Sequence, residues 1–153
     1  MTRFRNTVTI DPPIDEVFRF VANFENMSKW NYFVVDVHKL SPDPIGLGAV
    51  FHQTRKTDTQ QYRVTEFDPG RRIAVETLPP APSLVMRFTL EATGTGTSLT
   101  DEWEVGVGSG LLGVLGFLAA GRVNAAVREN LAKLKHLLEN REVRLQDGRV
   151  ETI

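Results

Sequence analysis

One change in hydrophobic period constrains the fold of this chain more than any other feature. From Tyr32 to Val105 apolar and polar residues alternate, which is typical of strands with one buried face. From Gly110 to about Asn140 the apolar residues recur at helical spacing, as along one face of a long helix. The chain therefore combines a run of strands with a single long helix near its C-terminus.

Turn-forming segments divide the alternating region into six strands. These segments are rich in glycine, proline, serine and aspartate, the residues that tight turns favour. Because the connections are short, we expect neighbouring strands to be antiparallel. The strands are expected at Tyr32–Leu40, Ala49–Lys56, Gln61–Phe67, Arg72–Leu78, Ser83–Ala92 and Thr97–Val105.

The N-terminal segment predicts one more strand and two short helices. Thr2–Ile10 alternates and is rich in Thr, Val and Phe, as a strand would be. Asp11 precedes two prolines and is expected to cap the first helix. A second short helix is expected from Phe24 to Trp30. The apolar stripe of the first helix comprises Ile14, Val17, Phe18 and Val21.

This order of elements predicts an α+β fold, with helices packed on one side of an antiparallel sheet. A long twisted sheet curls around a helix that covers its apolar face, here the long C-terminal helix. We expect residues 1–140 to form this single domain. The polar residues 141–153 are expected to be a frayed tail, although Asp147 and Gly148 could instead turn a small hairpin.

Composition excludes several classes of function. Lys and Arg number 18 against 19 Asp and Glu, so no excess of positive charge is available to hold nucleic acid. The absence of cysteine excludes disulfides, thiolate catalysis and zinc–thiolate sites, and it suits a reducing cytoplasm. No secretory signal is visible at the N-terminus. The histidines His38, His52 and His136 show no ligand spacing, so we expect no metal site.

The segment Gly110–Gly121, GLLGVLGFLAAG, is an uncharged run of 12 residues, too short for a membrane span. It overlaps a G-x-G-x-x-G pattern at residues 108–113, but no following strand completes a dinucleotide-binding unit. We therefore expect no nucleotide cofactor, and no cofactor of any other kind. The glycines could permit a mobile cavity entrance, or the run could be an apolar patch for membrane docking or for a homodimer.

The chain resembles the START/Bet v 1-like superfamily and, within it, the polyketide cyclase/dehydrase-like (SRPBCC) group of small bacterial proteins. The residues that carry the resemblance cover about residues 3 to 140. They are Ile10–Phe18, Trp30, Gly46–Gly48, Val64–Arg72 and Asn130–Glu139. The resemblance implies a helix-grip fold with a cavity between the sheet and the long helix. It implies no single activity, because the superfamily includes cyclases as well as lipid and hormone binders.

Asp101 is the most informative polar residue in the strands. It lies between Leu99 and Trp103 in the alternation, so its side chain should point toward the helix. A carboxylate in an apolar cavity must raise its pKa or find a cation, and Arg55 is the nearest candidate by face. Asp101 and Arg55 are therefore candidate catalytic residues, and the competing interpretation is a structural ion pair or a strand end already in solvent.

A larger set of residues is expected to line a ligand pocket. Its members are aromatic, apolar or polar side chains on the inward faces of strands and helices, as in pockets with few polar anchors. For the aromatic residues Trp30, Tyr32, Phe51, Tyr62 and Trp103 ordinary core packing is the alternative, and for Asn130 it is a satisfied buried amide. The set comprises Trp30, Tyr32, Phe51, Gln53, Tyr62, Thr77, Met86, Phe88, Trp103, Leu112 and Asn130.

Three functions follow from these observations. The first is binding or transport of a hydrophobic small molecule, such as a polyketide-, lipid- or quinone-like compound. This hypothesis predicts that the inward polar groups of the cavity do not converge on one point. The second is an enzyme of the cyclase/dehydratase type, with Asp101 as acid and base and Arg55 or Tyr62 polarising a carbonyl. That second hypothesis requires these side chains to reach one point. The third is an interaction protein that docks through Gly110–Gly121.

Overall fold

The computed structural model describes the backbone of residues 2–106 and 110–153 and the side chains of residues 2–106 and 121–153. The elements follow the order expected from the sequence, and every strand predicted before the long helix is present. They are β1 (Thr2–Ile10), α1 (Ile14–Ala22), the 3-10 helix η1 (Phe24–Lys29), β2 (Val34–Lys39), β3 (Val50–Arg55), β4 (Thr59–Asp68), β5 (Arg72–Thr77), β6 (Leu84–Thr93), β7 (Gly96–Val105), α2 (Gly110–Asn140), β8 (Glu142–Arg144) and β9 (Val150–Thr152).

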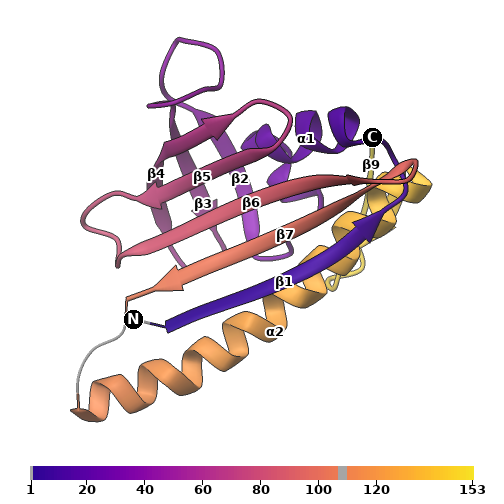
Figure 1. Ribbon diagram of the computed structural model, residues 1–153. Helices are drawn as coiled ribbons and strands as arrows, with labels where there is room; N and C mark the ends of the chain where they lie inside the picture. Colours follow the sequence, from indigo (N-terminus) through magenta and orange to yellow (C-terminus); the bar gives the residue numbers. More distant parts are fainter. Residues whose placement is uncertain (1, 107–109) are drawn as a thin grey trace.

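The first seven strands form one curled antiparallel sheet (Figure 1). Its order is β1-β7-β6-β5-β4-β3-β2. The chain therefore crosses from β1 at one edge to β2 at the other, and each later strand then pairs with the one before it until β7 lies beside β1. Irregularities in register between Val34 and Asp36 and between Val64 and Glu66 fall in β2 and β4. Such bulges bend and twist a strand locally, which helps a sheet to curl.

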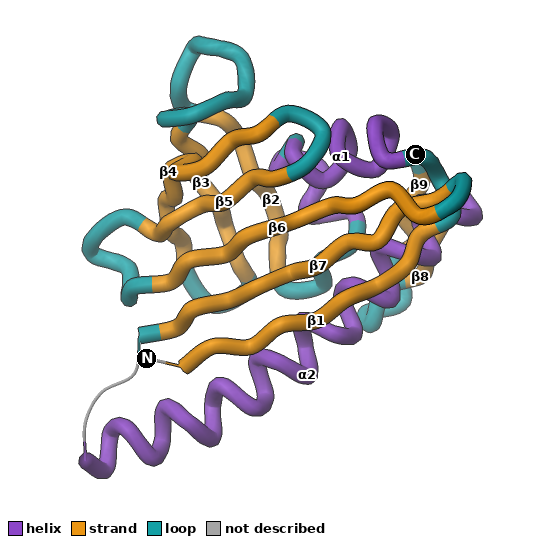
Figure 2. Tube along the Cα trace, in the orientation of Figure 1, coloured by secondary structure: helices purple, strands orange, loops and turns teal. Residues whose placement is uncertain are grey.

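Helix α2 lies along β1 and crosses the open side of the curled sheet, as Figures 1 and 2 show. Its C-terminal half presents an apolar stripe to the sheet because leucines recur there at helical spacing. The buried residues of this stripe are Val127, Leu131, Leu134, Leu137 and Leu138. The helix-grip fold expected from the sequence is therefore confirmed.

An aromatic cluster centred on Phe24 fixes η1 against the sheet. The Phe24 ring is 1% exposed and meets the rings of Phe51, Tyr62 and Phe88 with centroid separations of 5.4, 5.6 and 6.4 Å. Edge-to-face and stacked pairs of this kind add to the free energy gained by burial. The cluster places η1 inside the curl of the sheet, between β3, β4 and β6.

Two local predictions were wrong. Helix α1 begins at Ile14 with Pro13 at the N-cap and no side-chain cap, because the extended Pro13 separates Asp11 from the first turn. Asp11 instead donates its backbone N–H to Glu139 Oε2 at 3.0 Å. The C-terminal residues form the hairpin β8–β9 rather than a frayed tail, so the alternative of a small hairpin turned at Asp147 and Gly148 is confirmed. Val143 and Leu145 of this hairpin are buried, and two apolar anchors in a polar segment are a weak sequence signal.

Within the described part of the chain, no helix combines the length and apolar character that crossing a bilayer requires.

We predict that the mutation Phe24→Ala lowers the free energy of unfolding by about 3–5 kcal/mol, because it empties the centre of the aromatic cluster. Phe33→Ala is the matched control: Phe33 is 44% exposed, so its removal should cost less than about 1 kcal/mol. Urea denaturation of both variants measures the difference. Equal losses for the two variants would show that the cluster does not anchor η1.

Candidate functional site

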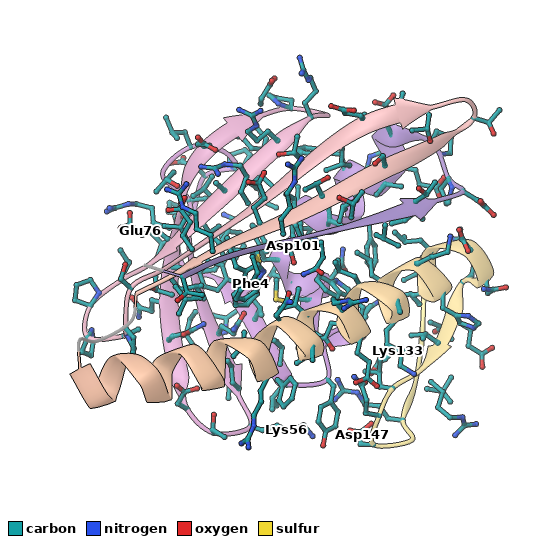
Figure 3. All side chains as sticks on the ribbon, turned by 60° about the horizontal axis from the view of Figure 1, so that its bottom comes forward. Phe4, Lys56, Glu76, Asp101, Lys133 and Asp147 are labelled. Atoms are coloured by element: carbon teal, nitrogen blue, oxygen red, sulfur yellow. The ribbon has the colours of Figure 1, made fainter. Side chains whose placement is uncertain are left out.

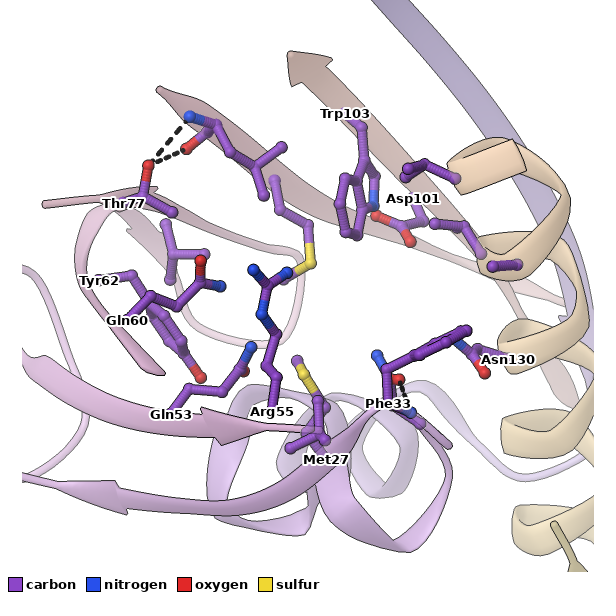
Figure 4. A pocket seen from close by; sticks show the side chains of 18 of the residues that line it. Met27, Phe33, Gln53, Arg55, Gln60, Tyr62, Thr77, Asp101, Trp103 and Asn130 are labelled. Carbon is purple, nitrogen blue, oxygen red and sulfur yellow. Dashed lines mark hydrogen bonds between the residues drawn. The ribbon is translucent and has the colours of Figure 1, made fainter. Parts of the chain in front are cut away.

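A cavity of about 320 Å³ lies between the sheet, η1 and the central turns of α2 (Figure 4). Apolar side chains form most of its wall, and they come from every layer of the fold. They include Met27, Trp30, Val34, Val75, Leu84, Met86, Val123, Ala126 and Val127. The cavity exists because α2 carries small or polar residues at these turns, whereas its later turns carry the leucines that fill the core.

Asp101 stands on the inward face of β7 and reaches the cavity, as Figures 3 and 4 show. It is 2% exposed, and its Oδ1 has no hydrogen-bond partner among the described residues. Burial raises the pKa of this carboxyl from 3.8 to about 7, and the nearby Trp103 indole N–H offsets the rise in part. The Trp103 N–H and the carboxylate lie close together without meeting hydrogen-bond geometry, so each has free bonding capacity.

A second polar group lies on the far side of the cavity. Tyr62 on β4 is 4% exposed, and its hydroxyl has no partner within the described structure. Burial raises the pKa of this phenol, so it stays protonated at neutral pH. The amide of Gln53 on β3 is directed toward the same region, beside the Tyr62 hydroxyl (Figure 4).

Arg55 does not pair with Asp101. Its guanidinium instead makes two hydrogen bonds with Asp58, Nε to Oδ1 at 2.7 Å and Nη2 to Oδ2 at 2.6 Å. These bonds lower the pKa of the Asp58 carboxyl. The inward face predicted for Arg55 is confirmed, since the side chain lines the cavity. Arg55 was the candidate cation for Asp101, but it pairs with Asp58 instead, because Asp58 lies in the turn that follows Arg55 and offers a local, more exposed partner.

The cavity opens beside an apolar rim with positive charge. Phe33 and Val123 are the exposed apolar residues of this rim, and Arg122 and Lys56 accompany them. The Lys56 ammonium lies 3.7 Å from Asp147 Oδ2 and 4.2 Å above the centre of the Tyr32 ring. The loop after β3 is thereby tied to the C-terminal hairpin.

Most of the proposed ligand-binding residues line this cavity, and three of the described ones do not. Those that do are Trp30, Gln53, Tyr62, Thr77, Met86, Trp103 and Asn130. Phe51 and Phe88 are fully buried in the cluster around Phe24, and Tyr32 lies outside the wall, beneath Lys56. The side chain of Leu112, like most of Gly110–Gly121, is outside the described residues.

Two polar residues of the predicted set, Thr77 and Asn130, form hydrogen bonds within the protein. The Thr77 hydroxyl donates to the Pro82 carbonyl at 2.8 Å and accepts from the Leu84 N–H at 3.0 Å, so it holds the β5–β6 connection. The Asn130 Oδ1 accepts a long hydrogen bond of 3.5 Å from Gln146 of the C-terminal hairpin. Both residues still contribute wall to the cavity.

Several wall residues were not among the sequence candidates. Arg122, Val123 and Ala126 precede Asn130 by 8, 7 and 4 positions, so helical spacing from Asn130 was a usable signal. Met27 and Phe33 lie in a 3-10 helix and a turn, where no regular period marks the inward positions. Among the described residues, no three His, Asp or Glu side chains gather as a metal site would need.

Comparison with known proteins identifies the kind of domain. A family model described as "Polyketide cyclase / dehydrase and lipid transport" matches residues 1–139. Among curated proteins, none matches the sequence.

Several solved structures share the fold at low sequence identity. A START superfamily protein from Mycobacterium smegmatis has a TM-score of 0.73 and 16% identity, over 90% of this chain and 97% of its own. The di-domain ARO/CYC StfQ of the steffimycin biosynthetic pathway has a TM-score of 0.67 and 22% identity, over 90% of this chain and 44% of its own. The Aha1 dimer from Colwellia psychrerythraea has a TM-score of 0.65 and 16% identity, over 91% of this chain and 97% of its own.

We predict that Asp101 makes the fold less stable as pH rises from 5 to 8. Its pKa is higher in the folded chain than in the unfolded one, so its contribution is full below pH 3.8 and is lost as pH rises through about 7. In urea denaturation, the free energy of unfolding of Asp101→Asn should therefore rise by a few kcal/mol relative to that of the wild type between pH 5 and pH 8. Glu102→Gln, on the opposite face of β7, should show a much smaller gain in the free energy of unfolding, because the Glu102 charge adds only a minor part to the rise in the Asp101 pKa. A carboxyl that titrates below pH 5 by NMR would contradict the prediction.

Proposed function

The chain belongs to the polyketide cyclase/dehydrase and lipid transport family, and we propose that it binds a hydrophobic small molecule in the cavity between α2 and the sheet. The observation that carries this proposal is the cavity itself. Its volume of about 320 Å³ suits a small ligand, and its wall is apolar with a few polar groups. A fold that needed only stability would fill this volume, because an empty apolar cavity costs free energy.

The separation of the polar groups supports binding rather than chemistry. Arg55 is held by Asp58 at the mouth, and Tyr62 stands on β4, three strands from Asp101 on β7. Chemistry at one carbonyl would need these groups within hydrogen-bond reach of a single point. Separated polar groups suit a ligand that is held at two places. The compounds we propose are polyketide-, lipid- or quinone-like molecules.

A second candidate function rests on Asp101. A carboxyl with a pKa of about 7 beside a bound polyketone could take a proton from a methylene between two carbonyls. The resulting enolate carbon would attack a carbonyl of the same molecule, and the protonated Asp101 would return its proton to the new alkoxide. The fold similarity to StfQ, an ARO/CYC protein, favours this candidate.

Two adjacent alanines of α2 allow a matched test of the binding proposal. Ala126 lines the cavity, whereas Ala125 is exposed and does not. We predict that Ala126→Trp lowers the affinity for the apolar fluorescent probe 1-anilinonaphthalene-8-sulfonate at least tenfold, because the indole occupies ligand volume. Ala125→Trp should retain the wild-type affinity. Fluorescence titration of the folded variants measures both.

Native mass spectrometry of gently purified protein provides an independent check of the same proposal. A small apolar compound present at stoichiometric amount in the wild type and in Ala125→Trp, and absent from Ala126→Trp, would support it. Equal probe affinity in all three proteins would contradict it, since the cavity would then not be the binding site.

For the second candidate, we predict that Asp101→Asn abolishes cyclisation of a linear poly-β-ketone, while Glu102→Gln retains it. Mass spectrometry after incubation would follow the product through the loss of water on dehydration. Unchanged turnover by Asp101→Asn, or no turnover by the wild-type protein, would eliminate the enzymatic candidate and leave the binding proposal intact.

A further inference from the structure

Three polar atoms in the wall of one cavity have no hydrogen-bond partner in the described part of the chain. They are the Tyr62 hydroxyl, Asp101 Oδ1 and the Trp103 indole N–H. An unpaired buried polar group costs on the order of 1–3 kcal/mol, so native proteins pair nearly all of them. Three such atoms facing the same cavity therefore indicate partners that enter the cavity from outside the chain.

These atoms form two separate poles. Asp101 and Trp103 are two residues apart on β7, so both side chains leave the same face of the strand and lie together in Figure 4. Tyr62 is on β4, with Gln53 of β3 beside it. The sheet order places β6 and β5 between β7 and β4, a separation of roughly 14 Å along the sheet. No single polar group on a ligand can bond both poles.

The wall between the poles is apolar. Met86 of β6 and Val75 of β5 occupy the intervening strands, and Met27 of η1 lines the same cavity. Methionine side chains adapt to flat or irregular apolar shapes. A ligand that spans the poles must therefore have an apolar middle.

The chemistry of each pole defines the group that it accepts. At the first pole a carboxyl oxygen lies beside an N–H donor, and a ligand hydroxyl satisfies both by donating to Asp101 and accepting from Trp103. At the second pole a protonated phenol and an amide can both donate, and a ligand carbonyl oxygen accepts from them.

Resting on the proposed binding function, we propose that the ligand is an apolar molecule with a hydroxyl group at one end, bound by Asp101 and Trp103, and a carbonyl group at the other, bound by Tyr62 and Gln53. The two poles then act as specificity determinants. Water can occupy the cavity before binding, since about ten molecules fit at liquid density. A ligand that displaces this water without replacing its hydrogen bonds leaves the poles unpaired and loses affinity.

Four naphthalenes test the two poles separately. The set is 6-hydroxy-2-acetylnaphthalene, 2-acetylnaphthalene without the hydroxyl, 2-naphthol without the carbonyl, and naphthalene without either. Equilibrium dialysis at pH 7 against the wild-type protein should rank the first compound tightest, each single-group compound about tenfold weaker, and naphthalene weakest.

Two substitutions assign each group to its pole. Tyr62→Phe should weaken the two acetyl compounds about tenfold and leave 2-naphthol unchanged. Asp101→Leu should weaken the two hydroxyl compounds to the same extent and leave 2-acetylnaphthalene unchanged or tighter. Naphthalene controls for folding, because both variants should bind it at least as well as the wild type.

The outcomes separate this inference from the proposed function. Equal affinity for all four compounds, together with loss of binding in Ala126→Trp, would overturn the two poles and retain the apolar site. Weakening of all four compounds by either substitution would also overturn them, since the effect would then be on the fold. Binding of none of the four would overturn the proposed function itself.

Discussion

The packing of α2 against the open side of the curled sheet is the interaction on which the rest of this structure depends. The apolar stripe of α2 carries different side chains in its earlier and its later turns. This difference divides the interior into a cavity and a filled core. Leu131, Leu134 and Leu137 fill the space between helix and sheet and close the core. One or two turns earlier, Val123, Ala126 and Asn130 are too small or too polar to do so, and the cavity begins there. One helix therefore supplies both the stability of the domain and the volume of its site.

The buried polar atoms extend this argument from volume to chemistry. Elsewhere in the described interior, the buried Thr97 finds a partner: its hydroxyl donates to the Pro12 carbonyl at 2.8 Å. At the cavity Tyr62, Asp101 and Trp103 do not. Two other buried polar atoms of the described residues, Thr89 Oγ1 and Arg149 Nε, also lack a hydrogen-bond partner, and neither lines the cavity. Three of the five unpaired atoms are thus gathered at one cavity, and adaptation to a ligand explains that concentration.

The sequence predicted the elements and the inward faces well, because both depend on local periodicity. Alternation alone placed Asp101 and Trp103 on the face of β7 that meets the cavity. It failed for Phe51 and Phe88, which share inward faces with cavity residues but meet Phe24 of η1. A period specifies a face and not what packs against it. The Asp58 partner of Arg55 and the anchoring of the β8–β9 hairpin also depend on side-chain geometry that no period encodes.

The same cavity could serve binding or catalysis, and the placement of its polar groups distinguishes them. A carboxylate buried without a cation lowers the stability of the folded chain at neutral pH, and an asparagine or leucine in its place would not. A role in recognition explains this cost, since a ligand hydroxyl would restore the missing bond. A role in proton transfer explains it equally, but it also requires a second polar group near the reacting carbonyl. Tyr62 is three strands away and Arg55 is bonded to Asp58, so recognition accounts for more of the arrangement.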